Sequence, residues 1–302
     1  MRGCHVIAWS LLIVFSAHWL PPCNAWAKVP CGCVCSCPDP PGGSSRQRQG
    51  RWFVVESQNF QACCDVSETR AGDLVRHAEA LRRSLQSKWL VTPTQESWNP
   101  RCQLVLHRDR QAYLRAVGRG GERTAGSSSV DVLDGRVTRR RIDLLGGDGF
   151  LTAALPHELT HVVLRDRFPE AQLPTWADEG MAILADSVAK QERHRRDLDE
   201  ALHLGTPLRV VTLLSLADYP RADLFGAFYG QSIALTEFLI SRKTPQWFVE
   251  FIECASRRGY DAALREYYDI DGVAALERCC QRHIDASMLT SRHGRRRSHS
   301  ST

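Results

Sequence analysis

The spacing of apolar residues along this chain alternates between two periods, one typical of strands and one typical of helices. Short apolar runs at 52–57 and 102–107 predict strands, and Asp134-Gly135 predicts a hairpin turn between strands at 130–133 and 136–145. From 67 to 89 apolar residues recur every three or four positions, as in a helix. Further helices are expected at 110–117, 150–168, 175–200, 228–242, 245–257, 261–268 and 273–286. The pattern predicts an α+β fold, with a small mixed β-sheet followed by a mostly helical C-terminal half.

Residues 1–27 have the features of a signal peptide. Arg2 precedes a short apolar run at 9–20, which is too short to span a bilayer. Ala25-Trp26-Ala27 fits the small-x-small pattern of a cleavage site, so a mature start near Lys28 is expected. After cleavage nothing else in the sequence is expected to cross a membrane. Export is therefore predicted, to the outside or to the periplasm and cell envelope.

The mature chain is predicted to have three parts: a linker at 28–50, a folded domain at 51–286 and a tail at 287–302. The linker is rich in Cys, Pro and Gly, a composition that cannot bury a core. Its alternating cysteines, Cys31, Cys33, Cys35 and Cys37, fit either local or intermolecular disulfides or metal capture. The basic tail is expected to be disordered, either simply solvated or holding the protein weakly to an anionic envelope.

Twelve cysteines, two of them in the predicted leader, suggest an oxidising compartment and disulfide bonds. Six of them fall in the predicted domain. Local packing favours disulfides that join Cys254 to Cys279 or Cys280, and Cys63 or Cys64 to Cys102.

The net charge of +5 does not indicate a nucleic-acid partner. Five arginines lie in the leader and the tail, so 39 − 5 = 34 basic residues face 34 acidic ones in the rest of the chain. A neutral body of this kind lacks the basic surface that nucleic acids require.

The candidate chemistry lies in Leu155-Pro156-His157-Glu158-Leu159-Thr160-His161, which contains the pattern H-E-x-x-H. On a helix, residues four apart lie on the same face, so His157 and His161 can present two imidazoles to one metal ion. Glu158 beside them can reach a water molecule on that metal. The apolar flanking residues predict a buried helix. His194 and His203 are unsupported as ligands.

A second segment follows, Pro174-Thr175-Trp176-Ala177-Asp178-Glu179-Gly180-Met181-Ala182. It is expected to begin a helix with Thr175 as N-cap and Asp178 at the capping-box position. Glu179 would then lie in the first turns and could supply a third metal ligand. Gly180 would let two helices approach closely.

These two segments, with Phe228-Tyr229-Gly230-Gln231-Ser232-Ile233-Ala234-Leu235, resemble the gluzincin metallopeptidases, and most of all their peptidase-MA-like branch. The matching pieces are H-E-x-x-H, W-x-x-E-G-x-A and Y-x-Q-S-x-A-L, in that order over roughly residues 150–240. The resemblance implies a zincin-like fold with Zn2+ held by His157, His161 and Glu179, and with Glu158 as catalytic base. It also implies that Tyr229 could stabilise an oxyanion, and that an extended peptide adds to the strand beside the metal helix.

The expected function is therefore peptide-bond hydrolysis on a peptide or protein substrate. The chain has no G-A-M-E-N-like run, with which zincin aminopeptidases hold a free N-terminus, so endopeptidase action is the default. One alternative is an exported, zinc-stabilised module that binds peptide or wall polymer without catalysis. Another is a disulfide-linked structural component of the envelope. The presence of Glu158 favours catalysis.

Overall fold

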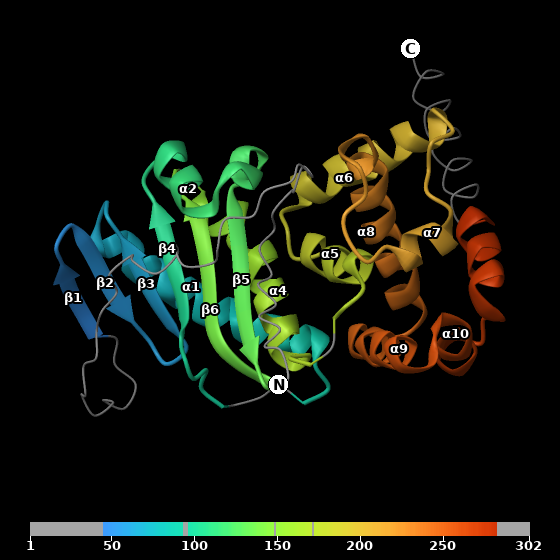
Figure 1. Ribbon diagram of the computed structural model, residues 1–302, viewed down its shortest axis with the longest axis horizontal. Helices are drawn as coiled ribbons and strands as arrows, with labels where there is room; N and C mark the ends of the chain where they lie inside the picture. Colours follow the sequence, from blue (N-terminus) through green and yellow to red (C-terminus); the bar gives the residue numbers. More distant parts are fainter. Residues whose placement is uncertain (1–44, 93–95, 148, 171, 283–302) are drawn as a thin grey trace, which may run out of the picture.

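The chain folds into a mixed sheet in its N-terminal part and a mostly helical remainder, as the α+β prediction required. The structure is a computed structural model that describes residues 45–92, 96–147, 149–170 and 172–282. Figure 1 shows the sheet on one side, the helical half on the other, and α4 (Leu155–Arg167) and α5 (Thr175–Ile183) between them. The six strands are β1 (Ser45–Gln49), β2 (Trp52–Glu56), β3 (Phe60–Cys64), β4 (Cys102–His107), β5 (Gly126–Leu133) and β6 (Arg136–Leu145).

The strands lie in the order β1-β2-β3-β4-β6-β5. β3, β4 and β6 run parallel, and β1, β2 and β5 are antiparallel to their neighbours. Alternate residues of the central strands, such as Leu104, Leu106, Ile142 and Leu144, are fully buried in the main core. Two helices contact the sheet through this core: α1 (Glu68–Trp89) and α4 (Leu155–Arg167).

The hairpin β5–β6 is confirmed, with Asp134 at φ 50° and Gly135 at φ 72° in its two-residue turn. β5 is the last strand of the sheet, bonded to β6 alone among the described strands. It also contacts α4, so the edge of the sheet lies against the helix that carries H-E-x-x-H.

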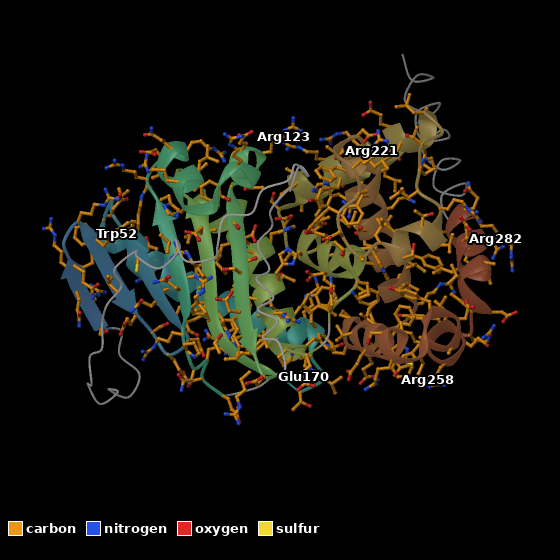
Figure 2. The ribbon with its side chains drawn as sticks, viewed as in Figure 1. Trp52, Arg123, Glu170, Arg221, Arg258 and Arg282 are labelled. Carbon is orange, nitrogen blue, oxygen red and sulfur yellow. The ribbon has the colours of Figure 1, made fainter. Side chains whose placement is uncertain are left out.

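The helical half begins with α5 and packs around α8. α5 contacts both α4 and α8, and α6 also packs against α8 (Figure 1). Charged side chains such as Arg123, Arg221 and Arg258 stand at the periphery of the molecule (Figure 2). The remaining helices are α2 (Arg110–Val117), η1 (Arg119–Arg123), α3 (Phe150–Ala153), α5 (Thr175–Ile183), α6 (Val188–His203), α7 (Val210–Ser215), η2 (Ala222–Leu224), α8 (Phe225–Arg242), α9 (Pro245–Arg258) and α10 (Tyr260–Tyr268).

Several predicted boundaries need correction. Residues 45–49 were expected in the linker but form β1, an exposed edge strand whose polar sequence gives no apolar signal. The helix expected at 150–168 is divided at Ala154 into α3 and α4. Pro174, not Thr175, is the N-cap of α5, because the helical backbone already begins at Thr175, whose hydroxyl donates to the Ala217 carbonyl. The helix expected at 273–286 is described from 272 to 282. The predicted leader, the rest of the linker and the tail lie outside the described residues.

The predicted cysteine pairings do not form in the described residues: Cys64, Cys102, Cys254, Cys279 and Cys280 are free. The strand register explains why Cys102 does not pair with Cys63 or Cys64. Cys102 lies opposite Phe60, so Cys63 and Cys64 stand three and four residues further along β3. At about 3.3 Å per residue this is about 10–13 Å, beyond the roughly 7 Å that a disulfide can bridge between Cα atoms.

Within the described residues, no helix combines the length and the apolarity that crossing a bilayer would require.

The close approach of α5 and α8 at Gly180 gives a first prediction. A Cβ at Gly180 would meet Thr236 Oγ1 and would lie 2.6 Å from the Ser232 carbonyl oxygen, which is backbone and cannot turn away. Gly180→Ala is therefore expected to destabilise the fold by about 1–3 kcal/mol or more, because the two helices must separate. The measurement is the free energy of unfolding from urea denaturation.

The matched control is Gly72→Ala in α1. A Cβ at Gly72 meets only the flexible end of Arg76, at 3.4 Å. This change is expected to be neutral or to stabilise the helix by about 0.5–1 kcal/mol. Equal effects of the two variants would contradict the close-packing explanation.

Candidate metal centre

Helix α4 places His157, Glu158 and His161 deep in the molecule. Pro156 lies in its first turn, where a missing backbone N–H breaks no intrahelical bond. Leu155, Leu159, Val162 and Val163 on the same helix are almost completely buried. Their burial fixes the helix, so His157 and His161, one turn apart, present their rings on one side of it.

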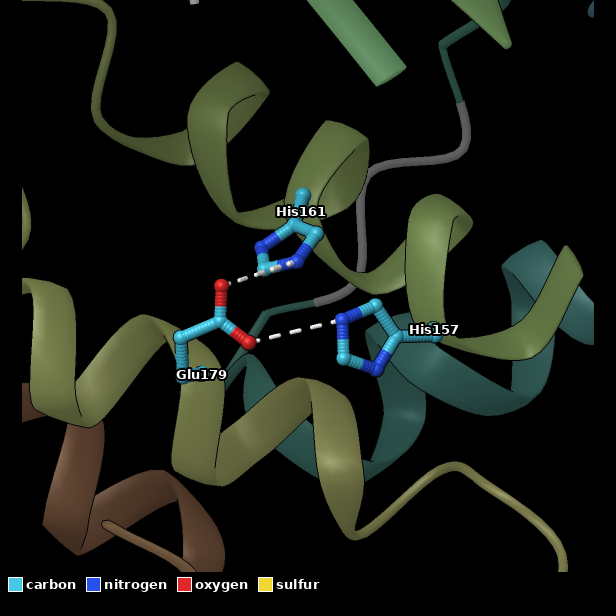
Figure 3. Close-up of side chains that lie close together, drawn as sticks. All are labelled: His157, His161 and Glu179. Carbon is cyan, nitrogen blue, oxygen red and sulfur yellow. Dashed lines mark ion pairs between the residues drawn. The ribbon is translucent and has the colours of Figure 1, made fainter. Parts of the chain in front are cut away.

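Glu179 on α5 completes the cluster, as predicted from the second motif. Figure 3 shows its carboxylate between the two imidazoles, each oxygen directed at a different ring. His157 Nε2 lies 3.4 Å from Oε2, and His161 Nε2 lies 3.9 Å from Oε1. One ligand atom from each of the three residues lies within 4.8 Å of the others, so the group could hold a metal ion.

The donor set fits a metal on two grounds. A tetrahedral ion holds its ligands at about 2.0–2.2 Å, which places neighbouring donors about 3.4 Å apart. His161 Nε2 and Glu179 Oε2 are also buried without a hydrogen-bond partner among the described residues. Buried polar atoms without partners are costly, and a shared ion would satisfy both.

The outer nitrogens of both rings face carboxylates that the sequence did not reveal in this role. His157 Nδ1 lies 3.0 Å from Asp186, which also accepts from Lys190 Nζ at 3.0 Å. His161 Nδ1 lies 3.0 Å from Asp178, in an ion-pair contact that is not aligned as a hydrogen bond. Carboxylates in these positions orient a ligating imidazole and direct its Nε2 to the metal. Asp178 had been expected in a capping box, and no sequence signal had pointed to Asp186.

The charges of this cluster shift three pKa values. Burial disfavours the imidazolium of His157, but Asp186 and Glu179 outweigh it and raise its pKa to about 10. Burial likewise opposes charge on His161, while Asp178 raises its pKa to about 8. Burial opposes charge on Glu179, yet His157 and His161 lower its pKa to about 2. Without a metal, the site is therefore a buried ion cluster at neutral pH.

These shifts predict how the stability of the metal-free chain depends on pH. The two histidines stabilise the fold fully below their ordinary pKa of 6.5, and this contribution is lost as pH rises toward about 10. Glu179 contributes above its ordinary pKa of 4.5 and loses this as pH falls toward about 2. The contribution of the cluster is therefore largest between pH 4.5 and 6.5.

The measurement is urea unfolding of chelator-treated protein at pH 6 and pH 9. The free energy of unfolding is expected to fall by on the order of 3 kcal/mol between them. With metal bound the trend should weaken or reverse, because metal binding requires neutral imidazoles. A metal-free profile that is flat over this range would contradict the ion cluster.

Glu158 follows His157 on α4, and the edge strand β5 holds its side chain. The Ser128 hydroxyl on β5 donates to its Oε2 at 2.7 Å, and both side chains are buried. Gly126 on the same strand makes room, since a Cβ there would lie 2.7 Å from Glu158 Cγ. Sequence analysis had not included residues 126–129 in the strand, because Gly-Ser-Ser-Ser has the composition of a loop.

Two tyrosines and a histidine from the helical half lie near the cluster of His157, His161 and Glu179. Tyr229, which the sequence analysis predicted for the site, lies near the carboxylates of Glu179 and Glu158. Burial, together with the charges of these two carboxylates, raises the pKa of Tyr229, so it keeps its proton. Its ring lies 5.4 Å from that of His194, whose pKa is lowered by burial. Tyr219, which sequence analysis missed, donates a hydrogen bond from its hydroxyl to Glu179 Oε1.

Comparisons with protein-family models and with curated protein sequences returned no match to this chain. The resemblance to gluzincins therefore rests on the three sequence motifs.

Proposed function

We propose that this chain is an exported zinc metallopeptidase of the gluzincin type, with a zincin-like fold. The observation that carries the proposal is the convergence of His157, His161 and Glu179 within 4.8 Å, with Glu158 held beside them. Three protein ligands with a fourth position open are typical of catalytic zinc, whereas structural zinc sites have four protein ligands. The export part of the proposal rests on residues 1–27 of the sequence.

Zinc, when bound, supplies a Lewis acid that makes water acidic near neutral pH and polarises a peptide carbonyl. His157, His161 and Glu179 would hold it. Glu158 would accept a proton from the attacking water and would pass it to the leaving amine. Ser128 keeps Glu158 in one orientation by its hydrogen bond. Tyr229, protonated at neutral pH, would donate a hydrogen bond to the carbonyl oxygen as it gains negative charge.

The edge strand β5 suggests how a substrate would bind. It is one of the two edge strands of the described sheet, and it carries both Gly126 and Ser128 next to Glu158. An extended peptide that adds to this edge would run past the proposed catalytic base. Main-chain binding of this kind, in the middle of a peptide, is compatible with endopeptidase action.

The test is to express the full chain in an oxidising host and to measure metal by elemental analysis. The protein is then incubated with a peptide library, and new termini are identified by mass spectrometry. We expect one zinc per chain and cleavage that a chelator stops and added zinc restores. Protein without bound metal would contradict the proposed zinc site and, with it, the proposed peptidase function. One zinc without any cleavage would favour the non-catalytic binding module.

A further inference from the structure

Tyr219 makes a contact with Glu179 that none of the three motifs contains. Its hydroxyl donates to Glu179 Oε1, and the two residues are 40 positions apart in the sequence. Oε2 of the same carboxylate has no hydrogen-bond partner among the described residues and lies 3.4 Å from His157 Nε2. Each oxygen of Glu179 faces one imidazole, but their surroundings differ. Oε1 accepts the hydrogen bond from Tyr219 and lies 3.9 Å from His161 Nε2, whereas Oε2 accepts none from the residues described and is the oxygen closer to a ring nitrogen.

The segment that carries Tyr219 is fastened to α5 at more than this point. Thr175, in the first turn of α5, donates its hydroxyl to the Ala217 carbonyl at 3.3 Å. Gln172, just before that helix, donates to the same carbonyl at 3.3 Å. The segment between α7 and η2 is thus fixed to the N-terminal part of the helix that supplies Glu179.

The Tyr219 ring is held equally firmly on its other side. It packs against Phe225 and Phe228, with ring centroids 6.4 and 5.8 Å away. These ring contacts, together with the hydrogen bond to Oε1, fix the direction of the Tyr219 hydroxyl.

We propose that Tyr219 is a positioning residue of the metal centre: its hydrogen bond to Oε1 makes Glu179 bind the metal through Oε2 alone. The inference rests on the proposed zinc site. A carboxylate that binds through both oxygens would occupy two coordination positions. A carboxylate restricted to one oxygen leaves a position open for water or a substrate carbonyl, which a catalytic site requires.

The variant that tests this is Tyr219→Phe, which removes the hydroxyl and keeps the ring that packs on Phe225 and Phe228. The probe is Co2+ in place of zinc, because four-coordinate Co2+ absorbs visible light more strongly than five-coordinate Co2+. We expect the absorption of the variant to weaken as Glu179 binds through both oxygens. Zinc affinity, measured by competition with a chelating dye, should fall about 10- to 100-fold, as for other groups that orient a ligand.

The matched control is Tyr229→Phe, which removes a neighbouring hydroxyl but not the one that donates to Glu179. Its cobalt spectrum and zinc affinity should equal those of the wild type, while its kcat should fall. Thermal unfolding of the metal-free variants establishes that both are folded. Should Tyr219→Phe not fold, X-ray absorption on the zinc-loaded wild type decides the matter. Four nearest N/O neighbours are expected, and five would overturn the inference.

The outcomes separate this inference from the function on which it rests. Wild-type protein that binds zinc and cleaves peptides, with an unchanged cobalt spectrum and affinity in Tyr219→Phe, would overturn only the role of Tyr219. Wild-type protein that takes up neither metal would overturn both. A weakened cobalt spectrum in Tyr219→Phe alone, with normal spectra in Tyr229→Phe, is the expected result.

Discussion

Glu158→Gln is expected to lower kcat/KM for peptide cleavage by about 10²- to 10⁴-fold, the usual contribution of a general base. The amide keeps the size of the carboxylate but cannot accept a proton from water. Metal content should remain at one ion per chain, because Glu158 is not among the three residues that form the ligand group. Elemental analysis and steady-state kinetics on the same preparation measure the two quantities.

The controls isolate the proton-accepting role. Glu192→Gln changes a carboxylate that is 51% exposed and paired with Arg195, so metal content and cleavage should both stay at wild-type levels. Ser128 donates to Oε2 of Glu158, and an amide oxygen placed there accepts the same bond, so the packing of α4 on β5 should survive. Unchanged cleavage by Glu158→Gln would remove Glu158 from the proposed mechanism, and loss of metal would point to a structural fault instead.

The residues that could be found from the sequence share one property: their roles are fixed by local spacing. His157 and His161 are separated by one helical turn, so one face of one helix decides their relation. Glu179 lies in the next helix, α5, which a short loop connects to α4 and whose apolar residues are evident in the sequence. The predicted hairpin likewise depended on two adjacent residues, Asp134 and Gly135.

The residues that were missed depend on contacts between distant segments. Asp186 and His157 are 29 positions apart, and Tyr219 and Glu179 are 40 apart. Periodicity within one element says nothing about such pairs. The edge strand was truncated for a related reason. Gly126 and Ser128 belong to β5 because they pair with Leu144 and Ile142 of β6, residues 18 and 14 positions away, which the local composition does not reveal.

Glu179→Gln is expected to lower zinc affinity by about 10²- to 10³-fold. Structural zinc sites bind with about 10–16 kcal/mol in total over four ligands, so one anionic ligand contributes roughly 3–4 kcal/mol. The loss should be large because Glu179 is 1% exposed and water cannot easily replace it as a ligand. Competition with a chelating dye at constant pH measures the affinity directly.

Asp178→Asn is the comparison that identifies the third ligand, because Asp178 is adjacent to Glu179 and lies 3.0 Å from His161 Nδ1. Asp178 contacts the outer nitrogen of the ring, away from the Nε2 atom that faces Glu179. Its replacement should therefore weaken binding only through the orientation of His161, at the lower end of the roughly 10- to 100-fold range for such partners. The reverse order, with Asp178→Asn losing the metal and Glu179→Gln keeping it, would assign the ligand to Asp178. That result would also contradict the positioning role proposed for Tyr219, because a carboxylate that does not bind metal needs no hydroxyl to restrict it to one oxygen.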